Sequence, residues 1–205
     1  MISTLSCLAL TSCVYEYYAT QRDAKRAPPP EDLVDIGRCK LHIHCEGAAR
    51  PNTPTILIEA GFWDCSESWR QVQSTLAKSG LAVCTYDRAG LGWSEQSPHP
   101  RTFEQMALEL KTGLEKKGVH PPFILIGHSV GGPIARYYRD KYPNDVVGMI
   151  FVDALHKKAP ELPRIFKVIT KAFYFLSLIP PIRPLLRLCF TAHSHGGMGR
   201  AKRKL

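Results

Sequence analysis

Apolar residues form short continuous runs in some parts of this chain and recur at helical spacing in others, and each pattern predicts an element. The runs at residues 81–85 and 123–126 have the length of buried strands. Residues 40–46 alternate between apolar and polar side chains, as a strand with one buried face does. Together these segments predict strands of a central sheet.

Helical spacing marks two further segments. Thr102-Phe-Glu-Gln105 has the form of a capping box. Apolar residues then recur on one helical face, at Phe103, Met106, Ala107, Leu110 and Leu114. In the second segment the shared face consists of Ile134, Ala135, Tyr138 and Tyr142. Because strands and helices alternate along the chain, we expect an α/β domain with a mostly parallel sheet and helices on both faces.

A strand that runs directly into a helix points most clearly to chemistry. Residues 123–126 lead into Gly127-His-Ser-Val-Gly131, with Ser129 at the centre of a G-x-S-x-G motif. A sharp strand-to-helix turn holds its central side chain above the sheet edge, and the two backbones approach too closely there for a Cβ. We interpret Ser129 as a nucleophile and Gly127 and Gly131 as the elbow glycines. The alternative is a glycine-rich structural turn.

Together with this motif, three other segments make the chain resemble the α/β-hydrolase family. Residues 55–62 look like its third strand and oxyanion loop, residues 86–94 like the loop after its fourth strand, and residues 149–154 like its sixth strand. They occur in the family's order within residues 33–154. The resemblance implies a serine hydrolase of carboxylic or lipid esters that needs no cofactor. A serine at the elbow argues against those relatives that use aspartate there to open epoxides.

The resemblance also implies which groups receive the negative charge of the reacting substrate. By position, the backbone N–H groups of Phe62 and Val130 form the oxyanion hole. Relatives often have His-Gly in this loop, but backbone donors do not depend on that histidine. Glu59 fits either a buried carboxylate bonded to backbone amides or the polar end of the strand, and we prefer the second interpretation.

The acid and base of a catalytic triad are harder to find. In this family they follow the nucleophile, and Asp153 is the acid that stands at the correct sheet edge. His193 is the candidate base, with His195 beside it, in a glycine-rich stretch that has the composition of a flexible tail. We therefore expect a chain truncated within the cap, with a sheet incomplete at the C-terminus. We also expect little activity, because loss of the base lowers the rate by about 10⁶.

Four parts are predicted along the chain. They are an apolar segment with a proline-rich linker, the hydrolase core, the start of a helical cap and a basic flexible tail, at residues 1–32, 33–154, 155–190 and 191–205. The apolar stretch of the first part, residues 1–14, is shorter than the about 20 apolar residues that span a bilayer, and it lacks the basic n-region of a signal peptide. We interpret it as an incomplete membrane anchor. The alternatives are a plain N-terminal helix and a lipoprotein processing site at Cys13.

The net charge of +9 is concentrated in the last quarter of the chain. Residues 1–154 carry 16 basic and 17 acidic side chains, whereas residues 155–205 carry 11 and one. Without a recognisable module or interleaved aromatic residues, this excess does not indicate nucleic acid. It suggests an anionic membrane surface as a partner, and hence a competing function as a noncatalytic, membrane-binding or partner-binding protein. A cap helix that shows its basic stripe to solvent is the simpler alternative.

Cysteine and histidine positions predict no metal site. The seven cysteines have no C-x-x-C spacing, which favours unpaired thiols, with Cys84 as a small apolar side chain in a buried strand. A Cys39–Cys45 bridge is the alternative. His42 and His44 share one face of the strand at residues 40–46, and without a third ligand we interpret that face as solvated.

Overall fold

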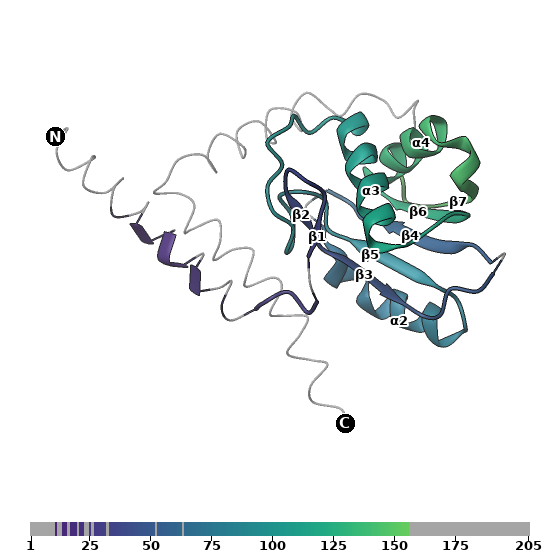
Figure 1. Cartoon of the computed structure of the whole chain (residues 1–205), viewed down its shortest axis with the longest axis horizontal. Helices are drawn as coiled ribbons and strands as arrows, with labels where there is room; N and C mark the ends of the chain where they lie inside the picture. The colour runs from purple at the N-terminus through teal and green to yellow at the C-terminus, as the bar shows by residue number, and fades with distance from the viewer. Residues whose placement is uncertain are drawn as a thin grey trace. The chain divides into compact units, whose positions relative to one another are not determined.

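In the computed structural model, the chain is described over residues 27–155 except 32, 52 and 63, and at scattered helical positions between 11 and 25. The described residues between Pro29 and Ala159 belong to one structural unit. Figure 1 shows the course of the chain through this unit, with a sheet at its centre and helices above and below it.

Five strands form the central sheet, in the order β3-β5-β4-β6-β7. Four are parallel to one another: β4 (Thr55–Glu59), β5 (Val83–Tyr86), β6 (Phe123–His128) and β7 (Val146–Val152). At one edge β3 (Ile43–Glu46) pairs with β5 in the antiparallel direction. A separate ribbon consists of β1 (Val34–Asp35) and β2 (Lys40–Leu41). The predicted mostly parallel sheet is thus confirmed.

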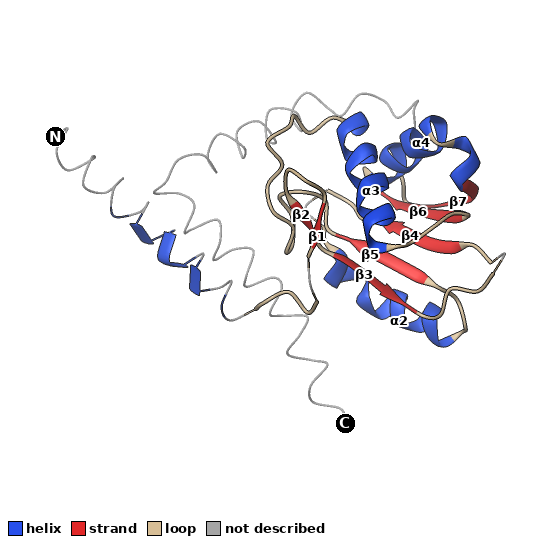
Figure 2. Ribbon diagram, viewed as in Figure 1, coloured by secondary structure: helices blue, strands red, loops and turns tan. Residues whose placement is uncertain are grey.

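Helices cover both faces of this sheet, as predicted (Figure 2). One face carries α3 (Phe103–Lys117) and α4 (Gly131–Lys141), and the other carries α2 (Arg70–Lys78). Short 3₁₀ helices precede α2 and follow α4, at Ser66–Trp69 (η1) and Pro143–Asp145 (η2).

The side chains of β4 enter two different cores. Leu57 packs in the cluster that α3 and α4 cover, whereas Ile56 and Ile58 belong to the cluster beside α2. Successive side chains of a strand point to opposite faces, so a strand covered on both sides needs apolar residues at every position. This requirement explains the continuous apolar runs in the sequence.

The start of α3 agrees with its sequence signature. The Thr102 side chain accepts a hydrogen bond from the backbone N–H of Gln105 at 3.1 Å. The Gln105 side chain, in contrast, donates to Glu109. Of the predicted apolar face, Ala107, Leu110 and Leu114 are buried, while Phe103 at the first turn is exposed. The apolar spacing therefore identifies the face of α3 that packs on the sheet.

The cysteine interpretation is wrong for the central sheet. Cys45 and Cys84 stand directly opposite each other in β3 and β5 and form a disulfide. Cys84 is therefore not a free thiol, and the bridge to Cys45 does not involve Cys39, which is free and buried. The pairing depends on two strands that are 39 residues apart in sequence, so spacing alone does not reveal it.

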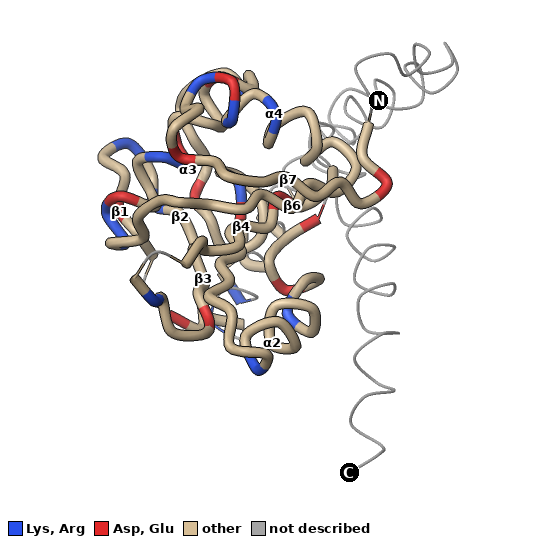
Figure 3. The backbone as a smooth tube through the Cα atoms, turned by 90° about the vertical axis from the view of Figure 1, so that its right-hand side faces the viewer, with Lys and Arg blue, Asp and Glu red and all other residues tan. Residues whose placement is uncertain are grey.

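At the other edge of the sheet, β7 pairs with β6 (Figure 3). Several of its apolar side chains are exposed, among them Val147, Ile150, Phe151 and Val152. The Arg136 guanidinium of α4 lies over the Phe151 ring, 4.2 Å from its centre. Among the described residues, no helix has the length and apolar character needed to cross a bilayer.

Candidate active site

Ser129 lies in the sharp turn between β6 and α4. Its φ is 50°, in the left-handed region that is unfavourable for a residue with a side chain. Its backbone N–H donates to the carbonyl of Val152 at the end of β7 (3.3 Å). Its own carbonyl accepts hydrogen bonds from the N–H groups of Gly132 (3.1 Å) and Leu155 (3.0 Å). These bonds hold a half-buried serine at the edge where the parallel strands end.

Close backbone packing explains why the motif has glycine at positions 127 and 131. A Cβ on Gly127 would lie 2.8 Å from the Cα of Gly132, and a Cβ on Gly131 would lie 2.2 Å from the carbonyl oxygen of Glu59. Both neighbours are backbone atoms, which cannot rotate away as a side chain can. Strand β6 and helix α4 can therefore come this close only where these residues lack side chains.

A buried ion pair supports the loop that follows β4. Arg88 Nη1 donates to Glu59 Oε1 and to the carbonyl of Ala60, both at 2.7 Å, and Nη2 donates to the carbonyl of Gly61 at 2.5 Å. The Tyr86 hydroxyl donates to the second carboxylate oxygen. Burial raises the pKa of Glu59, and the charge of Arg88 opposes this rise. Our interpretation of Glu59 as the polar end of a strand is wrong, because side chains from β5 and the loop after it surround its carboxylate.

Asp87 is the centre of a second buried network. Its carboxylate accepts hydrogen bonds from the backbone N–H groups of Ser66 (2.6 Å) and Trp93 (3.0 Å), and His42 Nδ1 lies 3.1 Å from Oδ2. Burial alone would raise the pKa of Asp87, but the bonds from His42, Ser66 and Trp93 outweigh it and lower that pKa. The network fixes the loop after β5 against η1.

The histidine face predicted to be solvated is largely covered, so that interpretation is wrong. His42 is 1% exposed, because η1 and the Trp93 ring pack against it. His44 is partly buried between the carboxylates of Glu31 and Glu46. Within the described part of the chain, no group of three His, Cys, Asp or Glu side chains is arranged to hold a metal ion.

Comparison with known proteins assigns this architecture to a family. A sequence model described as the alpha/beta hydrolase fold matches residues 54–175, which is more than half of the chain and includes the elbow. The chain belongs to the α/β-hydrolase family. The resemblance that the sequence motifs carry is thus confirmed.

Several α/β-hydrolases and related proteins resemble the chain over part of their length. The uncharacterised protein YqjL of Bacillus subtilis is 34% identical over 124 residues, which are 60% of this chain and 47% of YqjL. Epoxide hydrolase 4 of Mus musculus is 28% identical over 216 residues, which are 91% of this chain and 58% of the mouse protein. A marine microorganism esterase has the same fold, with a TM-score of 0.53 and 21% identity over 63% of this chain and 49% of the esterase. The chain therefore spans about half of the length of these relatives.

The predicted oxyanion loop of this α/β-hydrolase passes close to the elbow. A Cβ on Gly61 would lie 3.5 Å from the Cβ of Ser129. The next residue, Phe62, has an exposed side chain, and Val130 precedes the first residue of α4. The loop and the start of the helix thus meet at Ser129, and the assignment of the two N–H donors stays a prediction.

Sequence reasoning did not single out the residues beside the elbow that contact this loop. A Cβ on Gly61 would be 2.8 Å from Nδ1 of His128, and the Trp69 ring lies 5.7 Å from the histidine ring. Asp64 Oδ2 is 3.8 Å from His128 Nδ1 and accepts a hydrogen bond from Trp69 Nε1 at 3.0 Å. The only indication in the sequence is the position of His128 next to the serine.

The structure describes the candidate acid, Asp153, whereas the candidate base, His193, lies outside the described residues. Asp153 follows β7, is exposed and has a φ of 44°. It is adjacent in sequence to Val152, whose carbonyl is bonded to Ser129, so it stands at the same sheet edge. His193 and His195 lie outside the described residues. The roles of Asp153 and His193 stay predictions.

Proposed function

We propose that this α/β-hydrolase is a serine hydrolase of carboxylic or lipid esters, with Ser129 as its nucleophile. Ser129 Oγ would attack the carbonyl carbon of the ester, and the carbonyl oxygen would take up negative charge as the tetrahedral intermediate forms. The observation that carries the proposal is the φ of 50° at Ser129. Backbone strain of this kind persists only where the surrounding structure enforces it, and it is concentrated at functional positions.

The contacts of Arg88 support the assignment of Phe62 as an oxyanion donor. The carbonyl of Gly61 is directed toward Arg88 Nη2, and it also accepts a bond from the N–H of Asp64 at 3.3 Å. In a planar trans peptide the C=O and the following N–H point in opposite directions. The N–H of Phe62 is therefore turned away from Arg88. With the N–H of Val130, it would bind the oxyanion.

Asp153 and His193 are the candidate acid and base of this mechanism, although the tail-like composition around His193 leads us to expect little activity. A histidine would take the proton from Ser129 Oγ and deliver it to the leaving alcohol, while an acid would orient the histidine. Three described histidines in or beside the sheet have other neighbours: His42 contacts Asp87, His44 lies between two glutamates, and His128 faces Asp64. This distribution is the reason to retain His193 as the base.

Epoxide opening is the reaction named for the mouse relative, and Ser129 argues against it here. In the resemblance described above, epoxide-opening members use an aspartate at the elbow, where its carboxylate attacks the ring. Ser129 occupies that position in this chain. An ester is the better substrate class for a hydroxyl nucleophile, because attack on a carbonyl creates the oxyanion that backbone N–H groups stabilise.

A fluorophosphonate probe tests the proposal, since it reacts covalently with an activated serine. We expect weak labelling of the wild type at Ser129, in line with the little activity expected of this chain, and no labelling of Ser129→Ala; mass spectrometry of the peptides maps the site. Ser68→Ala is the matched control, because Ser68 is exposed in η1. Ester and epoxide turnover are measured on the same proteins. Equal labelling of Ser129→Ala, or epoxide turnover that survives this substitution, would overturn the assignment.

A second function is favoured by the charge distribution. Residues 155–205 carry 11 basic side chains and one acidic side chain. We propose that this region binds anionic membrane surfaces, where exposed basic residues are attracted to lipid headgroups. Such binding is compatible with a lipid-ester hydrolase, and it would also serve a protein without catalytic activity.

A further inference from the structure

A cavity of about 390 Å³ lies at the sheet edge opposite to Ser129. Strands β4 and β6 begin beside it, at Thr55 and the residues before Phe123, whereas they end at Glu59 and His128 near the elbow. Its volume is in the range of small-molecule sites. The cavity and the candidate active site are therefore separated by the length of the parallel strands.

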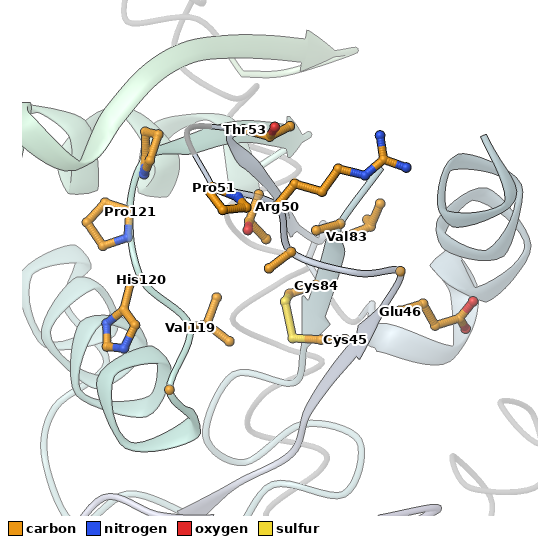
Figure 4. A pocket seen from close by; sticks show the side chains of 16 residues that line it. Cys45, Glu46, Arg50, Pro51, Thr53, Val83, Cys84, Val119, His120 and Pro121 are labelled. Atoms are coloured by element: carbon orange, nitrogen blue, oxygen red, sulfur yellow. A yellow bond between two sulfur atoms is a disulfide. The ribbon is translucent and has the colours of Figure 1, made fainter. Parts of the chain in front are cut away.

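The Cys45–Cys84 disulfide lines this cavity (Figure 4). The two cysteines differ in access: Cys45 is partly buried in the edge strand β3, whereas Cys84, one strand further in, is 4% exposed. A thiol that enters the cavity would therefore reach the sulfur of Cys45 more readily. Cys45 packs against the core from outside as a partly buried side chain, whereas Cys84 belongs to the buried core cluster itself.

Charged and polar groups surround the same opening. Arg50 and His120 lie on different sides of it, from the loops before β4 and before β6 (Figure 4). Arg50 is exposed, and a Cβ on Gly80 would lie 3.4 Å from its Nη2, so the guanidinium extends toward the α2–β5 loop. Glu46 also lines the cavity, and its Oε1 lies 3.0 Å from His44 Nε2. Arg50 gives the opening a cation that suits an anionic ligand.

We propose that the cavity is a thiol-exchange site, in which a small anionic thiol binds and reduces the Cys45–Cys84 disulfide. The carboxylate groups of the thiol would contact Arg50, and its sulfur would meet Cys45 Sγ. Glutathione has this chemistry, with carboxylates and a thiol in one small molecule. The site does not depend on Ser129 or on the proposed hydrolase reaction.

The exchange takes place in two steps that balance. In the first, the thiolate of one ligand attacks Cys45 Sγ, a mixed disulfide forms, and the electron pair of the broken S–S bond leaves on Cys84 as a thiolate. In the second, another thiolate attacks the ligand sulfur of the mixed disulfide and releases Cys45 as a thiolate. Two thiols are consumed and one small disulfide is produced, while Cys45 and Cys84 take up the two protons.

A comparison of thiols with different charge distinguishes binding at Arg50 from simple access to the sulfur of Cys45. Glutathione is anionic, 2-mercaptoethanol is neutral and cysteamine is cationic. The loss of the Cys45–Cys84 peptide is followed in the native protein by mass spectrometry after trapping with N-ethylmaleimide. Each rate is divided by the rate of the same thiol with a small reference disulfide. Peptide mapping distinguishes Cys45 and Cys84 from the free cysteines Cys39 and Cys65.

We expect the normalised rate of glutathione to exceed that of cysteamine, and a glutathione adduct at Cys45. Arg50→Gln should lower the glutathione-to-cysteamine ratio by roughly twofold to fivefold, the range for exposed charge contacts. Arg70→Gln is the matched control, because Arg70 is also exposed but does not line the cavity. Thermal melting of both variants shows whether they remain folded.

Three results would overturn the proposal. The first is a disulfide that all three thiols reduce only after denaturation. The second is a rate ratio that changes equally in Arg50→Gln and Arg70→Gln, or in neither. The third is a pair of free thiols at Cys45 and Cys84 in protein purified without reductant. A failure of this kind leaves the labelling of Ser129 unaffected, so the two proposals are judged separately.

Discussion

Arg88 Nη1 and Glu59 Oε1 lie 2.7 Å apart, and both side chains are almost fully buried. The same guanidinium binds the carbonyls of Ala60 and Gly61. One ion pair therefore links the interior of the sheet to the loop that passes Ser129. Such a pair is costly to break, because the remaining charge stays buried without a partner.

Replacing Arg88 tests this link. We expect Arg88→Met to lower the free energy of unfolding by about 3–5 kcal/mol, as removal of one partner of a buried pair does. Labelling of Ser129 by a fluorophosphonate should fall as well, because the Gly61 carbonyl loses the charged one of its two donors and keeps only the N–H of Asp64. Urea denaturation measures the first effect, and the labelling rate under folded conditions measures the second.

Arg70 provides the comparison for Arg88. It pairs with Glu67 at 3.1 Å, and both side chains are exposed. Arg70→Met should change the free energy of unfolding by no more than about 1 kcal/mol, since water screens exposed pairs. A similar small change for Arg88→Met would contradict the role assigned to the buried pair.

The Asp87 network should make stability depend on pH. The pKa of Asp87 is lower in the folded chain than its ordinary value. The ionised carboxylate therefore stabilises the fold above the unfolded pKa of about 3.9, and this contribution is lost as the pH falls through the lower, folded pKa. Asp87→Asn should cost about 1.5–3 kcal/mol at neutral pH, the range for hydrogen bonds to a charged group.

Urea denaturation of the wild type and Asp87→Asn between pH 7 and pH 3 measures this dependence. Their difference in unfolding free energy should narrow toward acid, because the wild type loses the charge that the variant never had. Glu67→Gln removes an exposed carboxylate and should track the wild type throughout. A wild-type advantage that stays constant to pH 3 would show that the charge of Asp87 is not responsible.

Much of this fold was predictable because its signals are local. The apolar run at residues 123–126, the glycines beside Ser129 and the Thr102 cap each determine the structure of their own segment. A few such segments in the order of a known family then predict the sheet. The closeness of Gly61 to Ser129 also follows, because the strands that precede them, β4 and β6, are neighbours in the sheet.

Contacts between segments far apart in the sequence were not predictable in this way. His42 was expected to face solvent, because alternation of apolar and polar residues in a strand shows only that its two faces differ. It does not show what covers the polar face. Its covering residues, Ser66 and Trp93, come from segments 24 and more residues later. The same holds for Glu59 with Arg88, which are 29 residues apart. A polar residue in a strand acquires its environment only when the sheet is assembled.

Neutralising the C-terminal basic cluster tests the membrane proposal. We expect the full chain to bind vesicles of anionic phospholipid, and to bind them less when Arg200, Lys202, Arg203 and Lys204 are changed to Gln. Each basic residue near such a surface contributes about 1 kcal/mol at low salt, so four changes should weaken binding by at least roughly tenfold. Sedimentation with vesicles gives the bound fraction.

Salt and a second variant control for nonspecific charge effects. Binding should decrease from low salt to about 1 M salt, where the screening length falls to about 3 Å. A variant that neutralises Arg70, Lys78, Lys116 and Arg139, all exposed in the hydrolase unit, loses the same charge elsewhere. If the two variants bind equally, net charge rather than the C-terminal cluster controls the association.

A methyl group at Gly131 tests whether the elbow depends on close backbone contact. An added Cβ would lie 2.2 Å from the carbonyl oxygen of Glu59, so β4 or α4 must shift. Replacing a helical glycine with alanine otherwise gains up to about 1 kcal/mol, but overpacking of this kind costs about 1–3 kcal/mol. We expect Gly131→Ala to be destabilised in urea and to lose fluorophosphonate labelling at Ser129.

Gly148→Ala is the matched substitution within the same sheet. Its added Cβ would lie 3.5 Å from Cγ1 of Ile124, an ordinary contact distance. No backbone must move, so the smaller entropy of the unfolded chain should leave stability unchanged or raised by up to about 1 kcal/mol. Labelling at Ser129 should persist. If Gly131→Ala behaves like Gly148→Ala in both measurements, the close approach of α4 to β4 is not what holds the serine in place.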